Sequence, residues 1–344
     1  MSRTATLVLA VDGNSLVHRA FHGQARTGFR SVAGRPLWAV RGLLSQLAAA
    51  VDRVAPDAVV VGFDDPDSSV RREQSPGYKA HRAEKLPALV DQLALAREVL
   101  GELGVSVVVP PGLEADDVLA SAAEQARRVG GESVIVTSDR DAFGLIDGST
   151  RVLRIINGGV EASPLLTPDR LVLLLGVRPD QYADFAALRG DPSDNLPGVR
   201  GFGPRKTAQL LAALGSVEAA FADLAAGGSQ VIAAVGPTLA TRLAEPSSRE
   251  TWEFNRAVMT MQTVVPVDID AGRLPLDAET VRATFRAHDL HWTTTTALRA
   301  FAHQAPSEPR PPTVTWDADW SAPRRRPALP RLPVRRQSDQ MTLF

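Results

Sequence analysis

Acidic residues stand at several separate places in this chain of 344 residues, each where an apolar segment ends or a helix is predicted to begin. The set consists of Asp12, Asp64, Glu114, Asp116, Asp117, Asp139, Asp141, Asp191 and Asp194. Carboxylates brought together at one edge of a sheet repel one another, and they stay ionised only when cations neutralise them. These residues therefore predict a metal site. For any one of them the alternative is a helix N-cap or a turn position, where aspartate is common.

The composition restricts which metal such a site would hold. The sequence has no cysteine, so thiolate zinc sites, cysteine nucleophiles and disulfides are excluded. Carboxylate oxygens favour Mg²⁺ or Mn²⁺ over zinc. Two such ions about 4 Å apart can activate a water and stabilise the leaving oxygen when a phosphodiester is attacked in line. The expected chemistry is therefore phosphodiester hydrolysis.

The elements that must position these acids alternate in the first half of the chain. β-branched runs predict strands at residues 7–11, 58–63, 105–109, 133–137 and 152–156. Amphipathic stretches between them predict helices at residues 37–54, 86–103 and 115–129. The expected fold class is α/β, a mostly parallel sheet flanked by helices, and such sheets bind ligands at the carboxyl ends of their strands.

The remaining composition excludes some classes of protein. Hydrophobic residues make up 44% and charged residues 22%, and no apolar run reaches the roughly 20 residues that span a bilayer. The first residues show no signal-peptide pattern, so a cytoplasmic protein is expected. The net charge of −1 decides nothing about nucleic-acid binding, because an acidic metal site can offset basic surface elsewhere.

The motifs around the acids occur in the order that is typical of one family. They are Val11-Asp12-Gly13, Ala20-Phe21-His22, Phe63-Asp64, Gly77-Tyr78-Lys79, Glu114-Ala115-Asp116-Asp117, Thr137-Ser138-Asp139-Arg140-Asp141, Gly190-Asp191-Pro192-Ser193-Asp194-Asn195-Leu196-Pro197-Gly198-Val199 and Gly201-Phe202-Gly203. Across residues 7–261 the chain resembles the 5′-nuclease family of flap endonucleases and 5′-3′ exonucleases, which includes the N-terminal domain of bacterial DNA polymerase I. The resemblance implies a PIN-like fold and a nuclease that acts without a polymerase domain of its own.

The resemblance also implies a role for each acid. The first metal position of the family corresponds to Asp12, Asp64, Glu114 and Asp116. The second corresponds to Asp139, Asp141, Asp191 and Asp194, and Asp117 matches an extra acid of bacterial members. Because no ligand position is vacant, we expect a complete active site in which Lys79 and Arg82 act in catalysis beside these acids.

Two segments are expected to bind DNA if the resemblance holds. Residues 66–90 match a helical arch under which a single-stranded 5′ end passes, and its DNA contacts would be Arg71, Arg72, Tyr78, Lys79 and Arg82. Residues 196–214 resemble a helix-hairpin-helix at which K⁺ bridges to duplex DNA in the family, and its contacts would be Gly198, Gly201, Gly203, Lys206 and Thr207. The alternatives are a solvated charged loop and a nucleotide-binding P-loop, although proline follows Gly203 where a P-loop has lysine.

The end of the chain carries a separate motif. Residues 304–344 are rich in proline and arginine, which predicts a flexible tail. The tail ends in Gln340-Met341-Thr342-Leu343-Phe344, which resembles the Gln-x-x-Leu-Phe peptide of sliding-clamp ligands, with Gln340, Leu343 and Phe344 as the contacts. An apolar terminus without a function is the alternative.

We therefore expect a PIN-like nuclease core at residues 1–166, a helical DNA-binding region at residues 167–303 and the tail. The expected activity is 5′-3′ exonuclease and 5′-flap endonuclease cleavage by two-metal catalysis, in Okazaki fragment processing and DNA repair. The substrate would be branched or 5′-ended duplex DNA, RNA-primed ends included, at the nucleoid. The rivals are a noncatalytic binder of branched DNA, which would lack metal ligands, and a two-metal phosphatase for small substrates, which would need no arch.

Overall fold

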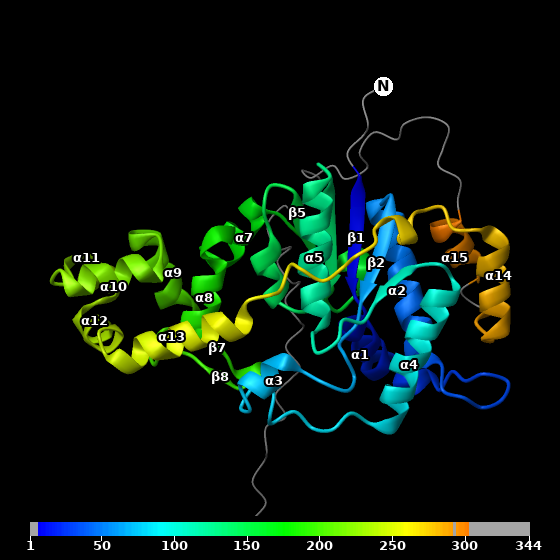
Figure 1. The fold of residues 1–344 in the computed structure, drawn as a ribbon, viewed down its shortest axis with the longest axis horizontal. Helices are drawn as coiled ribbons and strands as arrows, with labels where there is room; N and C mark the ends of the chain where they lie inside the picture. The colour runs from blue at the N-terminus through cyan, green and yellow to red at the C-terminus, as the bar shows by residue number, and fades with distance from the viewer. Residues whose placement is uncertain (1–5, 292–293, 303–344) are drawn as a thin grey trace, which may run out of the picture.

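A central sheet organises the molecule, as Figure 1 shows for the computed structural model, which describes residues 6–291 and 294–302. Its strands are β1 (Leu7–Asp12), β2 (Ala58–Gly62), β3 (Ser106–Val108), β4 (Glu132–Thr137), β5 (Thr150–Arg154) and β6 (Leu165–Leu166). They lie in the order β3-β2-β1-β4-β5-β6, and only β6 pairs antiparallel to its neighbour. The predicted α/β fold with a mostly parallel sheet is confirmed.

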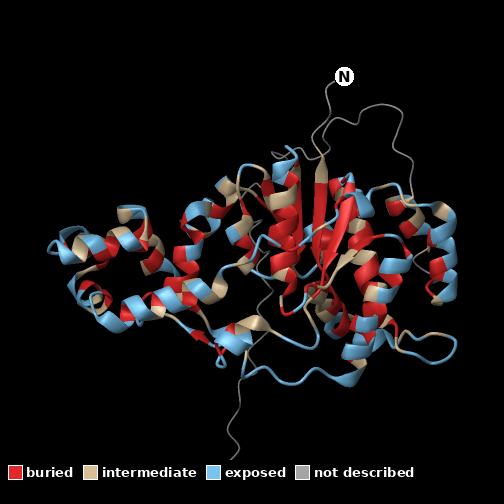
Figure 2. Cartoon of the chain, in the orientation of Figure 1, coloured by how far each residue is buried: buried red, intermediate tan, exposed pale blue. Residues whose placement is uncertain are grey.

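Strand β1 is buried on both faces, which explains its unbroken apolar sequence. In its register, Val11 lies between Val61 of β2 and Val136 of β4. Leu9 and Val11 face one hydrophobic cluster, whereas Val8 and Ala10 face a second cluster on the other side. Two layers of helices must therefore enclose the sheet, as the buried strands in Figure 2 illustrate.

Different helices cover the two faces. One face packs against α1 (Gly13–Gln24), α2 (Trp38–Val54), α4 (Pro87–Glu102), α14 (Ala278–Ala287) and α15 (Thr294–Phe301). The other face packs against α5 (Ala115–Arg128), whose small buried residues, such as Ala122, allow a close approach to the strands. Within residues 6–291 and 294–302, no single helix is long and apolar enough to span a membrane.

A lobe of short helices extends from the second face, at the left of Figure 1. It contains α7 (Pro168–Leu175), α8 (Tyr182–Arg189), α9 (Pro204–Leu214), α10 (Val217–Ala225), α11 (Ser229–Val235), α12 (Pro237–Leu243) and α13 (Pro246–Met259). A hairpin of β7 (Gly190–Asp191) and β8 (Leu196–Pro197) follows α8, and between its strands lies the 3-10 turn η4 (Pro192–Asp194). Smaller elements are α6 (Gly159–Ala162), η1 (Ala25–Thr27), η2 (Asp141–Leu145), η3 (Pro179–Gln181) and η5 (Asp270–Gly272).

The segment at residues 66–86 differs from a continuous helical arch. It holds one short helix, α3 (Val70–Gln74), followed by turns. Helix α4 begins at Pro87, inside the arch limits of 66–90, because proline suits the first position of a helix. The expected limits of about 66–90 therefore include the first turn of α4, and the extent of the arch stays a prediction.

Candidate metal centre

The carboxyl ends of β1 and β2 supply the first two acids. Asp12 closes β1 and caps α1, accepting the Ser15 amide at 2.8 Å, and its other oxygen accepts the Thr137 hydroxyl at 2.8 Å. Asp64 follows β2 and accepts the Ala115 amide at 3.0 Å. The sheet order reverses between β1 and β4, and in open parallel sheets ligands bind at such a switch point. The acids therefore lie where the fold favours a binding site.

Uncharged residues that sequence reasoning missed hold these acids in place. Asn14 donates its side-chain amide to Asp64 at 2.5 Å and accepts the Asp64 amide at 3.1 Å. Thr137 is fully buried, and besides its bond to Asp12 it accepts the Asp139 amide at 3.0 Å. The available signal was a polar residue two positions from an acid, since Asn14 follows Asp12 and Thr137 precedes Asp139 at that spacing. One hydroxyl thus links an acid of the first expected metal position to an acid of the second.

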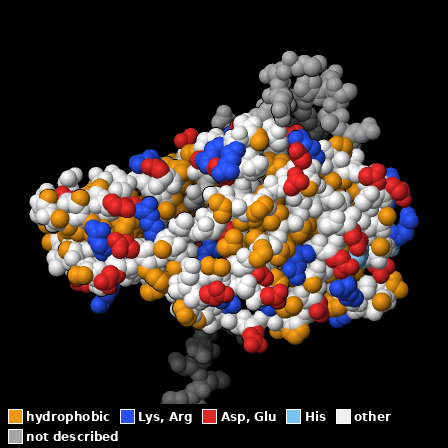
Figure 3. All heavy atoms as spheres, in the orientation of Figure 1, with side chains coloured by type: hydrophobic (Ala, Val, Ile, Leu, Met, Phe, Trp, Pro, Cys, Tyr) orange, Lys and Arg blue, Asp and Glu red, His pale blue; other side chains and the backbone are white. Residues whose placement is uncertain are grey.

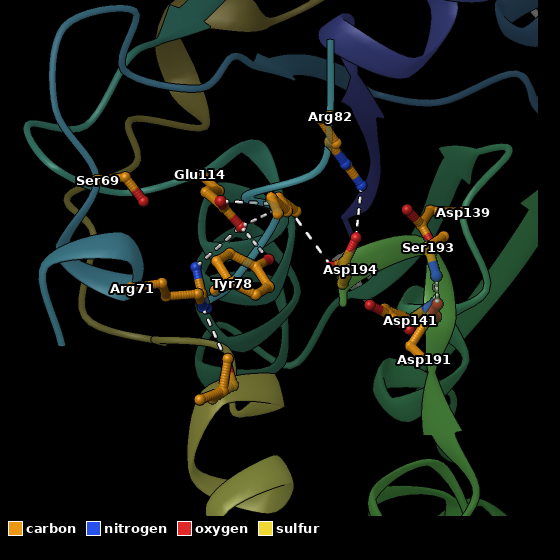
Figure 4. A network of polar contacts seen from close by, with 12 residues as sticks. Ser69, Arg71, Tyr78, Arg82, Glu114, Asp139, Asp141, Asp191, Ser193 and Asp194 are labelled. Carbon is orange, nitrogen blue, oxygen red and sulfur yellow. Dashed lines mark hydrogen bonds and ion pairs between the residues drawn. The ribbon is translucent and has the colours of Figure 1, made fainter. Parts of the chain in front are cut away.

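The start of α5 supplies the next acids. Glu114 is the N-cap of this helix, and it accepts the Tyr78 hydroxyl at 3.0 Å and the Lys79 ammonium at 3.1 Å. Figure 4 shows Tyr78 and Arg71 pointing toward it. Asp116, in the first turn, has a buried Oδ1 atom without a hydrogen-bond partner among the described residues. An unpartnered buried carboxylate oxygen is costly unless something else binds it.

The remaining acids lie on the opposite side of the site in Figure 4. Asp139 follows β4, and it accepts the amide of Asp141, which begins η2, at 3.1 Å. Asp191 caps η4 by accepting the Ser193 amide and hydroxyl, both at 2.7 Å. Asp194 is 6% exposed and pairs with Arg82 at 2.5 Å. The helical lobe therefore contributes two acids to a site built on the sheet.

The carboxylates perturb one another strongly. Burial, together with the charges of Asp64 and Asp139, raises the pKa of Asp12 to about 7. Burial and the nearby acids, first Asp139, raise the pKa of Asp141 to about 7. The pKa of Asp116 is also raised well above its usual range by burial and then by Asp12. A divalent cation would relieve this repulsion and occupy the free Asp116 oxygen, so the residues present fit Mg²⁺ or Mn²⁺.

This electrostatic strain predicts how stability depends on pH. Because the folded-state pKa values of Asp12 and Asp141 lie near 7, protonation stabilises the metal-free fold at low pH. That contribution, on the order of a few kcal/mol, is lost as the pH rises through about 7. We expect the Tm of the chelator-treated protein to fall between about pH 5 and pH 8. Mg²⁺ should raise the Tm more at the higher pH, and a flat or rising Tm of the chelated protein would contradict this account.

Three expected roles near α5 do not fit the observed contacts: Asp117 as a metal ligand, and Arg71 and Tyr78 as DNA contacts. Asp117 is 0% exposed, and its two oxygens accept both terminal nitrogens of Arg71 and the amides of Glu114 and Gln262, so it cannot be a direct metal ligand in this arrangement. Arg71 was expected to contact DNA, yet its guanidinium is occupied by these and other acceptors. Tyr78 is likewise 6% exposed and bound to Glu114, so it is not on the DNA-contacting surface.

The helix-hairpin-helix segment also needs correction. Thr207 is 0% exposed and its hydroxyl donates to the Phe202 carbonyl at 3.3 Å, so it does not face DNA. Gly198 is required for another reason, because a Cβ there would lie 1.9 Å from the Arg189 carbonyl oxygen. Gly201 and Gly203 are exposed, and Gly203 caps α9 with open space where a Cβ would lie. Those glycines, the half-buried Lys206 and the exposed Arg72 remain candidates for DNA contacts.

The face drawn in Figure 3 shows no separate basic surface that would indicate where DNA binds. In Figure 3, hydrophobic side chains gather in the middle of the face that is seen, and acidic and basic side chains are interspersed around them. The predicted clamp contacts Gln340, Leu343 and Phe344 lie outside the described residues.

Comparison with known protein families gives two matches along the chain. Residues 7–171 match the N-terminal resolvase-like domain of 5′-3′ exonuclease, and residues 177–281 match its C-terminal SAM fold. DNA polymerase I of Mycobacterium bovis is 37% identical over 262 residues, which cover 76% of this chain and 28% of that protein. The thermostable DNA polymerase I of Thermus aquaticus is 42% identical over 217 residues, 63% of this chain and 25% of that protein. The chain thus spans about a quarter of the length of these relatives.

Solved structures share the fold. The T5 D15 protein co-crystallised with metal ions matches with a TM-score of 0.60 and 18% identity, over 86% of this chain and 99% of that one. The catalytic core of Rad2 in complex with a DNA substrate matches with a TM-score of 0.53 and 17% identity, over 86% and 91%. At these identities the likeness concerns the fold alone.

Proposed function

Since the chain belongs to the 5′-3′ exonuclease family, we propose that it is a structure-specific nuclease that hydrolyses DNA phosphodiesters at 5′ ends and 5′ flaps. The observation that carries this proposal is the meeting of acids from the sheet edge and from the helical lobe: Asp191 and Asp194 of the lobe act on Asp141, and Asp141 acts on Asp116, whose buried oxygen has no partner among the described residues. A noncatalytic binder of branched DNA would have no reason to keep such repelling groups together.

We propose two divalent metal ions, Mg²⁺ or Mn²⁺, at this site. Asp12, Asp64, Glu114 and Asp116 would hold one ion, and Asp139, Asp141, Asp191 and Asp194 would hold the other. When bound, such ions activate a water molecule and stabilise the leaving oxygen. The carboxyl-only donor set and the raised pKa values of Asp12 and Asp141 support this assignment.

Lys79 and Arg82 would act on the substrate phosphate itself. The Lys79 ammonium lies 3.1 Å from Glu114 and 3.8 Å from Asp194, so it sits among the acids on both sides of the site. Its backbone has a positive φ of 55° and donates to the Asp194 carbonyl at 2.9 Å, which fixes its position. Arg82 is more exposed, at 46% of its side chain. Both cations would stabilise negative charge on the scissile phosphate.

The helical lobe would hold the duplex part of the substrate. Helix α9 begins at Pro204, which has no N–H, so its first backbone amides are those of Arg205 and Lys206, close to the exposed Gly203. Helix N-termini attract phosphate, and basic side chains add to that attraction. We propose K⁺ at this hairpin as an additional bridge. Primer removal from Okazaki fragments and excision repair at the nucleoid are the processes that such an activity would serve.

The first test compares wild type with Asp139→Asn on a labelled 5′-flap duplex, with Mg²⁺ and with a chelator, recording cleavage and binding separately. We expect cleavage near the junction only with Mg²⁺, and its loss in the variant while DNA binding persists. Tight binding without any cleavage by the wild type would favour the scaffold function. Hydrolysis of a small phosphomonoester without flap cleavage would favour a phosphatase.

We also propose that the C-terminal pentapeptide binds a bacterial sliding clamp. Leu343 and Phe344 would fill an apolar pocket and Gln340 would add polar contacts, as in peptide recognition by hot-spot residues. Replacing both Leu343 and Phe344 with alanine should weaken clamp binding at least about tenfold, because each lost anchor costs a large share of a short peptide's affinity. Titration with purified clamp measures this, and undiminished binding would rule the peptide out. Flap cleavage without the clamp should not change.

A further inference from the structure

A buried ion pair joins the segment at residues 66–86 to α5. The two terminal nitrogens of Arg71 each donate to one oxygen of Asp117, both at 2.7 Å. The side chain of Arg71 is 12% exposed and that of Asp117 is 0% exposed. Such a parallel pair of charge-assisted bonds fixes both the distance and the relative orientation of the two side chains.

Every donor of the Arg71 guanidinium has an acceptor. Besides Asp117, it donates to Glu114 at 3.3 Å and to the carbonyls of Val258 at 3.0 Å and Thr260 at 3.1 Å. A guanidinium has five N–H groups, and these contacts use all of them. No donor is left for a phosphate of the substrate. Figure 4 shows this side chain directed toward Glu114 rather than outward.

Both carboxylate oxygens of Asp117 likewise accept hydrogen bonds. Its oxygens also accept the amides of Glu114 at 3.0 Å and of Gln262 at 2.7 Å. The first of these bonds belongs to the capping box at the start of α5, which orients the turn that carries Glu114 and Asp116. The carboxylate therefore has no free oxygen directed into the metal centre, although its neighbours one and three residues earlier in the chain are expected ligands.

We propose that Arg71 and Asp117 are a pair of positioning residues, which orient Glu114 and Asp116 and anchor α3 and the end of α13 to α5. In this assignment Asp117 is not a metal ligand and Arg71 is not a phosphate contact. The pair acts on the reaction only through the acids that it holds. The assignment rests on the proposed nuclease function for its kinetic readout, but its structural readouts do not depend on that function.

The test compares Asp117→Asn, Arg71→Met and the double variant Arg71→Met/Asp117→Asn. Positioning partners of metal ligands typically contribute about 10- to 100-fold to activity. We expect each single variant to lower kcat on a 5′-flap duplex by that amount, with KM nearly unchanged. The kcat of the double variant should fall no further than that of the worse single variant, because the effects of two residues that act as one unit are not additive. A loss equal to the product of the two single losses would overturn the proposal.

Mn²⁺ binding and DNA binding separate this role from the two alternatives. Calorimetric titration should give the wild-type number of Mn²⁺ ions in Asp117→Asn and in Arg71→Met, whereas Asp139→Asn should lose an ion. Loss of an ion in Asp117→Asn alone would make Asp117 a ligand. Weaker binding of flap DNA in Ca²⁺ by Arg71→Met, but not by Asp117→Asn, would make Arg71 a phosphate contact. Either result contradicts the proposal.

Two further variants serve as a safeguard against misfolding and as a control. Arg71→Lys replaces Arg71→Met if the latter does not fold. It keeps the charge but not the planar guanidinium, so it should fold and lose less kcat. Arg128→Met removes an exposed arginine that pairs with Glu124 on the same helix, and it should behave as wild type in every assay. If the wild type cleaves no DNA, the nuclease proposal fails, and the Mn²⁺ titration still decides the role of Asp117.

Discussion

Replacing Asp116 with asparagine is expected to lower kcat on a 5′-flap duplex by at least about a thousandfold. Partners of a metal ligand already cost about 10- to 100-fold when removed, and Asp116 is placed to be a ligand itself. Its Oδ1 atom is buried without a partner, and its charge interacts with Asp12, Asp139 and Asp141, which belong to both expected metal positions. Single-turnover cleavage at saturating Mg²⁺ measures the effect directly.

The same substitution should stabilise the metal-free protein. Asparagine removes one of several repelling buried groups without changing the side-chain shape, so the Tm in chelator is expected to rise while activity is lost. Asp91→Asn, at an exposed position on α4, is the matched control and should change neither quantity. Cleavage within tenfold of wild type by Asp116→Asn would contradict its assignment as a ligand.

Lys79→Met is expected to lower kcat by roughly 100- to 1000-fold, the usual loss when one preorganised group that stabilises transition-state charge is removed. The lysine is 13% exposed and lies within 3.8 Å of acids from both α5 and η4. Methionine keeps the length of the side chain and its packing on the Tyr78 ring, which the ammonium overlies at 4.6 Å from the centroid. The KM for flap DNA should change much less than kcat, because the group acts at the reacting phosphate.

Lys85→Met provides the comparison for this prediction. Lys85 belongs to the same charged segment but is exposed, and it forms no ion pair with the acids in the described part of the chain. Its loss should reduce kcat by no more than about threefold, and any effect should weaken with added salt, as for an exposed charge. Equal losses in the two variants would mean that the segment supplies only a general positive field.

Much of the fold and the acid set could be predicted from the sequence. Strand runs such as residues 7–11 and 58–63 are apolar throughout, and a buried parallel strand requires that pattern. The acids that follow them were identified because the carboxyl ends of parallel strands meet at one edge. Helix α1 and the short strand β6 were not predicted, although α1 buries Leu16, Val17, Ala20 and Phe21 at helical spacing; β6 has only two residues.

The roles of several side chains could not be predicted from position alone. Asp117 and Asp116 are adjacent in the sequence, yet one is fully paired with Arg71 and the other has a free buried oxygen. Tyr78 and Thr207 have polar groups that suit DNA contacts, but tertiary packing directs both into the protein. A helix turns by about 100° per residue, so neighbouring acids face different surroundings that only the packed structure defines.

The meeting of sheet and lobe acids has a consequence for synthesis of the protein. Two hydrogen bonds join the segment at residues 66–86 to the hairpin of the lobe. The Lys79 amide donates to the Asp194 carbonyl at 2.9 Å, and the Asn195 side chain donates to the Gly77 carbonyl at 2.7 Å. A nascent chain that has folded only its sheet lacks Asp191 and Asp194, and its charged segment has no partner to close against. Nuclease action should therefore begin only after the lobe has emerged from the ribosome and docked.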